Sequence, residues 1–124
     1  SPTRIPQAFV VGATNNQLIS SGKDAKASFS RTGTNISAFA PGESVALLNF
    51  NGVSVTNSGT SFSAPYIAGI FAVACQAAGT FCNTATNATT LYDALRNTGI
   101  IGTVTNTNGT PLTGATSRFI VQQW

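Results

Sequence analysis

The stretch from Phe62 to Ala78 is apolar around nearly its whole circumference and carries no charged residue. A helix with this pattern is buried on most sides in a globular protein, rather than lying with one face in water. Pro65 lacks a backbone N–H and is tolerated in a first turn, so we expect the helix to begin within a few residues of Ser61. Gly79 accepts a positive φ and is expected to end it. The chain must therefore fold around one buried helix that opens at a serine.

Short apolar segments before this helix predict β-strands. Residues 8–13 are continuously apolar, which is typical of a strand buried on both faces of a parallel sheet. Residues 14–26 are polar, contain Gly22 and show no periodicity, so we expect a surface loop there. Further short strands are expected at 27–29, 36–40, 44–47 and 53–55, with Asn51-Gly52 as the hairpin turn before the last of them.

The part of the chain after the apolar helix gives fewer signals. A second helix is expected over about 89–98, where a threonine can cap the start and Gly99 the end. Residues 118–121 predict a last short strand. With 124 residues the chain forms one domain at most.

Charged residues are few and scattered, which excludes several classes of function. Only 7% of the residues are charged, and the net charge of +3 comes from Lys and Arg residues that do not cluster. A nucleic-acid interface needs clustered Lys and Arg, so we predict no nucleic-acid partner. No uninterrupted apolar segment reaches the about 18 residues that a membrane-spanning helix needs. The low charge and the many Thr, Asn, Ser, Gly and Ala residues favour a secreted, extracellular protein.

Two cysteines, Cys75 and Cys82, flank a glycine-containing turn. In an oxidising compartment they could close a small loop with a disulfide; the alternatives are two free thiols or one bridge to another chain. Two cysteines without any histidine do not make a credible zinc site, and we assign no metal ligand. Three N-x-S/T sequons, which chance explains in so Asn- and Thr-rich a chain, occur at Asn35, Asn87 and Asn108.

Ser61 stands at the corner where a strand leads into the apolar helix. Its backbone N–H is a free donor of the helix N-terminus and could point at a developing oxyanion, while Gly59 allows a substrate backbone to approach closely. A serine hydroxyl is a poor nucleophile until a base takes its proton, and this chain contains no histidine. The local alternative is that Ser61 or Thr60 merely caps the helix.

Residues 59–69, GTSFSAPYIAG, closely resemble the active-serine motif of the subtilases, the subtilisin-like serine peptidases, in which G-T-S-x-x-x-P opens the central helix. Three further segments resemble the family in the family's order: PQAFVVGA at 6–13, ASFS at 27–30 and FAPG at 39–42. The resemblance covers residues 1–99 and places the Thr-rich tail by position only.

The resemblance implies that Ser61 is the catalytic nucleophile and that its N–H forms part of the oxyanion hole. The substrate-cleft neighbours implied in the same way are Asn57, Ser58, Gly59, Thr60 and Phe62. The family places its catalytic Asp and His and its oxyanion Asn upstream of these segments, and Asp24, Glu43 and Asp93 match no triad position. Asn15 stands where some relatives carry an acidic calcium ligand, so structural calcium is an expectation for the full enzyme without a ligand assigned here.

The implied fold is α/β: the C-terminal portion of a subtilisin-like three-layer fold, with a mostly parallel sheet and a central buried helix after the nucleophile. We expect residues 1–124 to be the C-terminal segment of a single catalytic domain, and the start at Ser1-Pro2 to mark a processed product or excised piece. Alone, such a segment exposes a sheet edge and one face of the apolar helix.

The resemblance therefore predicts a secreted serine endopeptidase of two chains, acting on a protein or peptide substrate. The separate N-terminal chain of the same precursor supplies the His, the Asp and the oxyanion Asn, because this chain has no histidine. The alternative is a non-catalytic subtilase-derived pseudoenzyme, or a released fragment, that acts as a structural or binding module.

Overall fold

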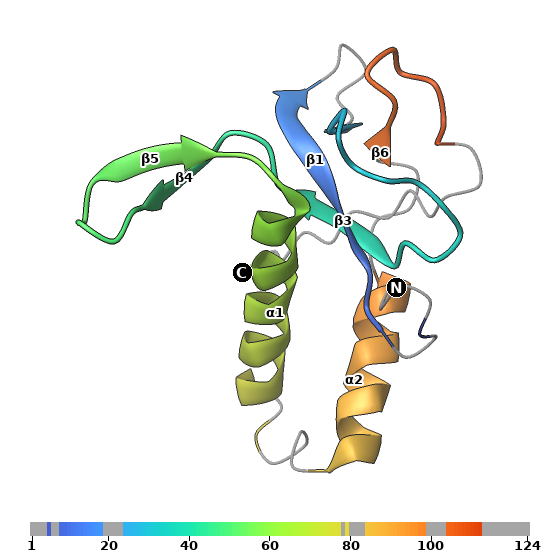
Figure 1. Ribbon diagram of the computed structural model, residues 1–124. Coiled ribbons are helices and arrows are strands. Elements are labelled where there is room, and N and C mark those ends of the chain that lie inside the picture. Colours follow the sequence, from blue (N-terminus) through green and yellow to red (C-terminus); the bar gives the residue numbers. More distant parts are fainter. Residues whose placement is uncertain are drawn as a thin grey trace.

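Strand β1 (Val11–Leu18) runs through the centre of a four-stranded sheet. The computed structural model describes residues 5, 8–18, 24–77, 79, 84–98 and 104–112. The other strands of this sheet are β2 (Asp24–Lys26), β3 (Ala38–Pro41) and β6 (Val104–Thr105), in the order β3-β1-β2-β6 (Figure 1). The β1–β3 and β2–β6 pairs are parallel and the β1–β2 pair is antiparallel. The sheet is thus mixed with a majority of parallel pairs, in agreement with the expected α/β class.

The prediction of a surface loop over residues 14–26 is wrong. β1 continues through the polar residues 14–18, and β2 pairs with this second half, with Thr14 opposite Lys26 and Leu18 opposite Asp24. Strand pairing satisfies backbone groups whatever the side chains are, so a polar segment can extend a strand when a partner is near. The segment 27–29, expected as a strand, instead forms a turn that follows β2.

A two-stranded antiparallel ribbon extends away from the sheet (Figure 1). It consists of β4 (Val45–Leu48) and β5 (Ser54–Asn57). Its turn is held by the Asn49 side chain, whose Oδ1 accepts the N–H of Asn51 at 2.9 Å and of Val53 at 3.0 Å, while Gly52 adopts a φ of 75°. The predicted Asn-Gly hairpin is confirmed, and Phe50 at its tip is 96% exposed.

The apolar helix is α1 (Thr60–Ala77), and Gly79 follows it with a φ of 63°, as predicted. Its described buried residues form one stripe at spacings of four and three: Ser63, Ile67 and Ile70. The expected burial on most sides is therefore not present in this chain, because only one face of α1 packs on the sheet. Exposure of the other face is what we expected for the segment on its own.

Pro65 lies farther inside α1 than the sequence suggested. With Thr60 as the first helical residue, Pro65 falls in the second turn rather than the first. A proline at this position cannot donate the usual hydrogen bond to the carbonyl four residues earlier, which belongs to Ser61. The consequence is a gap in the backbone hydrogen bonds of α1 at the serine.

The second helix, α2 (Ala85–Thr98), begins earlier than predicted and ends where expected. Thr84 precedes it, and its Oγ1 accepts the N–H of Asn87 at 3.2 Å, so the capping residue is a threonine but lies about five residues before the predicted start. Gly99 and the predicted strand at 118–121 lie outside the described residues.

Both faces of the sheet carry apolar side chains. On one face Ala38 and Ala40 of β3 pack against Ile67 and Ile70 of α1. At the end of this core three rings, Phe9, Phe71 and Tyr92, join the segment just before β1 to both helices, with centroid distances of 5.4 Å for Phe9–Phe71 and 4.9 Å for Phe9–Tyr92. On the other face the core consists of Ile36, Phe39, Val104 and Leu112.

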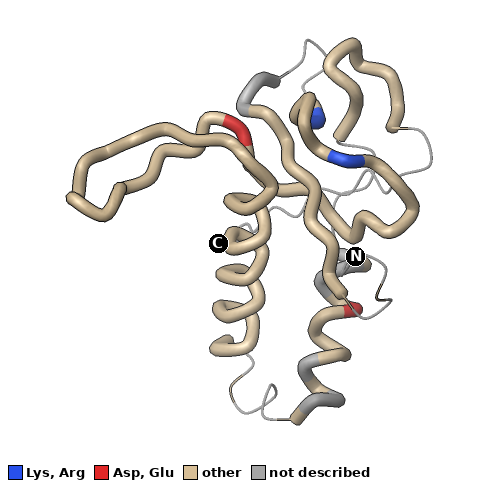
Figure 2. The backbone as a smooth tube through the Cα atoms, viewed as in Figure 1, with Lys and Arg blue, Asp and Glu red and all other residues tan. Residues whose placement is uncertain are grey.

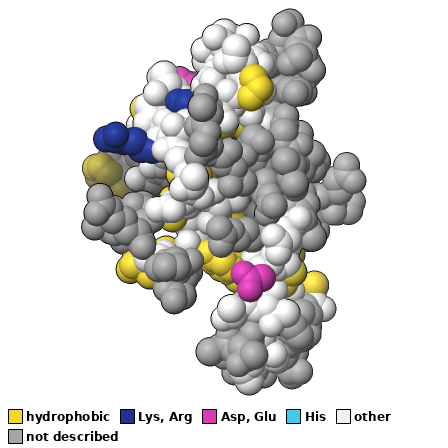
Figure 3. Space-filling view, turned by 90° about the vertical axis from the view of Figure 1, so that its right-hand side faces the viewer, with side chains coloured by type: hydrophobic (Ala, Val, Ile, Leu, Met, Phe, Trp, Pro, Cys, Tyr) yellow, Lys and Arg dark blue, Asp and Glu magenta, His cyan; other side chains and the backbone are white. Residues whose placement is uncertain are grey.

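Charge contributes little to this arrangement. Figure 2 shows no charged residue on α1, in agreement with its sequence. Among the described residues, no helix has the length and apolar character needed to cross a membrane. Figure 3 shows apolar side chains reaching the surface on the face that it views, and the large exposed apolar residues among those described include Ile5, Phe29 and Tyr66.

Candidate active site

Ser61 is the second residue of α1 and its side chain is exposed. The N–H groups of a helix's first turn have no intrahelical acceptor, so the Ser61 N–H is available to a ligand, and the positive end of the helix dipole favours a negative charge there. The N–H of Phe62 donates to the carbonyl of Gly59 at 3.0 Å, which places Gly59 at the helix cap position. Hydroxyl and amide of Ser61 are therefore presented together at the surface.

The start of α1 is attached directly to the end of β3. The N–H of Gly59 donates to the carbonyl of Gly42 at 2.7 Å, and the N–H of Gly42 donates to the carbonyl of Thr14 on β1 at 3.1 Å. A Cβ atom on Gly42 would lie 2.7 Å from the Cβ of Ala13 and 3.0 Å from the carbonyl oxygen of Gly59. Helix and strand thus approach as closely as a glycine permits.

The expected cleft neighbours surround this corner. Asn57 ends β5 and is exposed, and its Oδ1 accepts the N–H of Ser58 at 2.8 Å. The Oγ of Ser58 accepts the N–H of Ser44 at 3.0 Å and so closes the base of the ribbon. Thr60 is exposed, and the ring of Phe62 is half-buried beside Gly59. The ribbon base and the first turn of α1 therefore meet at Ser61.

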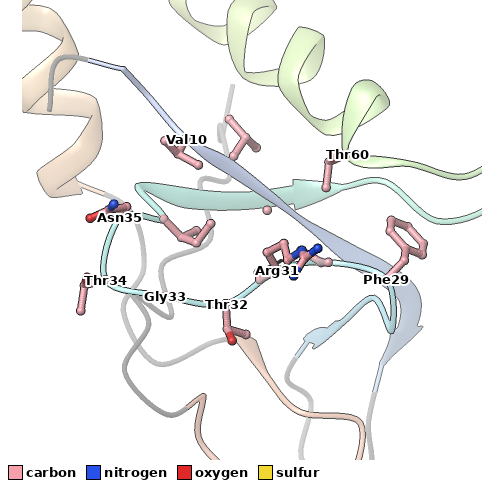
Figure 4. A pocket seen from close by; sticks show the side chains of 12 residues that line it. Val10, Phe29, Arg31, Thr32, Gly33, Thr34, Asn35 and Thr60 are labelled. Atoms are coloured by element: carbon pink, nitrogen blue, oxygen red, sulfur yellow. Dashed lines mark hydrogen bonds between the residues drawn. The ribbon is translucent and has the colours of Figure 1, made fainter. Parts of the chain in front are cut away.

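Two open hollows lie beside the start of α1, near the beginning of β1. The smaller, of about 330 Å³, is lined by Thr60, Ser61 and Ala64 on α1 and by residues 8–11 on the other side. The larger, of about 950 Å³, lies between β1 and the segment 29–36, and Thr60 reaches it from α1 (Figure 4). Figure 4 shows Arg31 and Phe29 on its wall near Thr60. Val10 and Val11 line both hollows, so both lie where β1 begins.

The chain cannot activate Ser61 with a histidine, because it has none. Among the described residues no group of three or more His, Cys, Asp and Glu side chains could hold a metal ion. Burial raises the pKa of Asp24 above its ordinary value near 3.8. Cys75 is disulfide-bonded. Cys82 lies outside the described residues, so the pairing of the two cysteines stays a prediction.

Sequence reasoning missed one residue of this corner. Ser63 is fully buried, and its Oγ lies 3.1 Å from the carbonyl oxygens of both Ala40 and Pro41. Its spacing from Ile67 and Ile70 is the one signal that could have placed it on the buried stripe of α1. Its hydrogen-bond acceptors, more than twenty residues earlier, could not be found from the sequence.

Together the fold and the site define a class: an α/β chain that presents an exposed serine at the N-terminus of a helix packed on a mixed sheet. The sequence profile of the subtilase family (peptidase S8) matches residues 1–118. The chain belongs to the subtilase family, which confirms the resemblance found in the sequence.

Individual relatives agree with this assignment. The chain is 42% identical over 72 residues to the subtilisin-like serine protease AsES of Sarocladium strictum, covering 58% of this chain and 17% of that protein. It is 37% identical over 78 residues to the extracellular serine proteinase of a Thermus strain, covering 61% of this chain and 18% of that protein.

The fold has a close counterpart among solved structures. The crystal structure of a cold adapted subtilisin-like serine proteinase superposes with a TM-score of 0.69 at 28% identity, covering 99% of this chain and 40% of the other. The subtilisin-like fold is thereby shown. The chain spans less than half the length of each of these relatives.

Proposed function

We propose that Ser61 is the nucleophile of a subtilisin-like serine endopeptidase. The observation that carries this proposal is the exposed Ser61 in the first turn of α1, where backbone N–H groups have no intrahelical acceptor, beside an open hollow. Membership of the subtilase family supports the same role. Gly59 rather than Ser61 occupies the helix cap position, so capping does not account for a serine at residue 61.

The chemistry follows from this geometry. The Ser61 hydroxyl oxygen attacks the carbonyl carbon of the scissile peptide bond, while its proton passes to a histidine, which an Asp orients. The Ser61 N–H donates to the oxyanion, and an Asn side chain supplies the second donor. Collapse of the tetrahedral intermediate breaks the C–N bond, and the histidine returns the proton to the leaving amine. Water then hydrolyses the acyl-enzyme and frees Ser61.

The histidine, the Asp and the Asn belong to polypeptide outside this sequence. We assign them to a separate N-terminal chain of the same precursor, and residues 1–124 to the C-terminal segment of one catalytic domain. Two features support this assignment: two open hollows lie beside the start of α1, and the outer face of α1 is exposed. Open hollows beside an exposed apolar helix face form a surface that another segment covers in a stable protein.

We place the protein outside the cell. Its low charge and its disulfide-bonded Cys75 are typical of secreted proteins, and the matching Thermus proteinase is named as extracellular. Asn57, Ser58 and Phe62 then border the cleft next to the scissile bond, so they contact the peptide substrate near Ser61.

Labelling with a fluorophosphonate probe tests the proposal on the native material. We expect covalent labelling of Ser61, located by peptide mapping, and a second polypeptide with the expected His and Asp in the same purified species. Ser61→Ala should abolish labelling and lower peptide hydrolysis by roughly 10⁶. Ser58→Ala, which removes a neighbouring exposed hydroxyl, is the matched control and should still be labelled.

The other outcomes are equally informative. A labelled protein whose triad lies on one continuous chain keeps the peptidase assignment and refutes the two-chain arrangement. A species that carries His and Asp but never labels favours the non-catalytic module instead.

A further inference from the structure

Ser63 is a polar residue on the buried face of α1, where an apolar side chain would be expected. It begins the buried stripe that Ile67 and Ile70 continue along α1, and its exposed fraction is 0%. The hydroxyl lies 3.1 Å from the carbonyl oxygens of Ala40 and Pro41, so it donates its one proton to the end of β3. A buried hydroxyl without an acceptor is costly, and here the acceptors belong to another element of the fold. The bond therefore fixes α1 against β3.

The position of Ser63 decides which way Ser61 faces. Successive residues of an α-helix are rotated by about 100°, so two residues apart are about 200° apart and point to opposite sides. Ser63 faces the sheet and is buried, whereas Ser61 faces outward and is exposed. A rotation of the first turn that released Ser63 would turn the Ser61 hydroxyl away from its present direction.

The helix itself holds Ser61 less firmly than an ordinary helical residue. Pro65 has no N–H, so the carbonyl of Ser61 lacks its intrahelical donor. Hydrogen bonds to β3 and the residue after it lie on both sides of Ser61. The N–H of Gly59 donates to the carbonyl of Gly42 at 2.7 Å, and the hydroxyl of Ser63 donates to the carbonyl of Ala40. No Cβ would fit on Gly42 beside the Ser63 Oγ, so the strand also blocks any deeper seating of the helix.

We propose that Ser63 is a positioning residue for Ser61. Its buried hydroxyl sets the rotation and depth of the first turn of α1, and thereby the direction of the Ser61 hydroxyl and N–H. This inference rests on the proposed nucleophilic role of Ser61. It extends that role by adding a residue that touches no reacting atom and acts through the backbone alone.

Ser63→Ala in the complete active protein is the main test. We expect kcat, and the rate of fluorophosphonate labelling, to fall by about tenfold or more while KM changes less than twofold, because a small misplacement of a nucleophile costs rate rather than binding. Ser37→Ala is the matched control: Ser37 is 2% exposed, and its Oγ accepts the N–H of Val10 at 3.2 Å. The control should lose comparable stability and keep its kcat.

Amide hydrogen exchange gives a readout that needs no activity. In Ser63→Ala we expect faster exchange of the Phe62 amide, by about tenfold or more, and no such change in Ser37→Ala. Should Ser63→Ala fail to fold, Ser63→Cys keeps a similar volume with a weaker donor and should show smaller changes in the same direction.

The two proposals fail separately. If the unaltered protein neither hydrolyses peptides nor labels, the nucleophilic role of Ser61 fails, and the exchange data alone decide whether Ser63 fixes the first turn. If Ser63→Ala unfolds more easily but matches Ser37→Ala in kcat, labelling rate and exchange, Ser63 only satisfies buried carbonyls and the positioning role is overturned.

Discussion

The carbonyl oxygen of Gly42 accepts the backbone N–H of Gly59 at 2.7 Å, across the junction where β3 ends and α1 begins. This is a main-chain bond between two glycines that are far apart in sequence. It joins the strand layer to the helix layer at the residue just before the helix that carries Ser61. Even a small substitution at Gly42 or Gly59 should therefore shift the first turn of α1 and with it Ser61.

Gly42→Ala should destabilise the protein. The added methyl group would meet the Ser63 Oγ, the Ala13 Cβ at 2.7 Å and the Gly59 carbonyl oxygen at 3.0 Å, none of which is the free end of a long side chain. Overpacking of this kind costs about 1–3 kcal/mol of unfolding free energy. Urea unfolding followed by circular dichroism measures the loss.

Gly69→Ala is the control for the same chemical change. Gly69 is an exposed helical residue with no atom within 4 Å of an added Cβ, so alanine should stabilise α1 by about 0.5–1 kcal/mol. If Gly42→Ala and Gly69→Ala moved the urea unfolding midpoint in the same direction, the close contact at Gly42 would be refuted.

Pro65→Ala should raise the free energy of unfolding. The new N–H can donate to the Ser61 carbonyl, which recovers part of the about 3 kcal/mol that a proline costs inside a helix. Alanine also leaves the unfolded chain more conformational freedom than proline does, which lowers the free energy of unfolding by about 0.4–1 kcal/mol. We therefore expect a net gain of about 1–2 kcal/mol in the free energy of unfolding. Thermal and urea unfolding should agree on the sign. A decrease would mean that the proline is not an interruption of α1.

Tyr92→Phe should leave stability unchanged or raise it by up to about 1 kcal/mol. The Tyr92 hydroxyl is buried and has no hydrogen-bond partner in the part of the chain that the structure describes, whereas its ring contacts Phe9 and Phe71. Removing an unsatisfied buried hydroxyl relieves a desolvation penalty and keeps both ring contacts. Tyr66→Phe, at a 54% exposed tyrosine, is the control and should be neutral.

A different result would also identify a contact. If Tyr92→Phe cost more than about 1 kcal/mol in the complete protein, the hydroxyl would be bonded to a group outside the described residues.

Asp24 should make stability depend on pH in the acid range. Burial raises its pKa in the folded state above the ordinary value near 3.8, so the folded protein holds this proton more tightly than the unfolded chain. Between 3.8 and the raised pKa the native state binds more protons, and the contribution of Asp24 to stability falls as the pH rises. Above the raised pKa the free-energy cost of burying the ionised Asp24 carboxylate no longer changes with pH.

Asp24→Asn should remove the decrease in stability that accompanies the ionisation of Asp24 as the pH rises. Urea midpoints of the variant should lie above those of the unaltered protein at neutral pH, and the difference should shrink as the pH drops towards 3.8. Asp93→Asn, at an exposed carboxylate on α2, controls for the loss of one negative charge. A difference that grew on acidification would contradict the direction of the shift.

The sequence predicted those elements whose signals are local. Gly79 marked the end of α1, and Asn51-Gly52 marked the turn of the ribbon, because a positive φ at a glycine needs no distant partner. The polar half of β1 was missed because its strand character comes from pairing with β2 and not from its own residues. Pairing of this kind is a tertiary effect that side-chain periodicity does not report.

The candidate site divides in the same way. Ser61 was predicted to be the nucleophile because the residues around it form a contiguous pattern in the sequence. Ser63 was not assigned a role, because serines two residues apart at a helix start look alike in sequence. Only the fold places one of them against the carbonyls of Ala40 and Pro41 and leaves the other exposed.

The attachment of α1 to β3 also sets what a protein engineer would have to transplant. Grafting the segment from Gly59 to Pro65 alone onto a foreign helix would transfer the serine without the hydrogen bonds that hold the start of α1 against the end of β3. The smallest portable unit is a discontinuous one: the strand end through Gly42 together with the first two turns of α1, held at glycine-to-glycine distance.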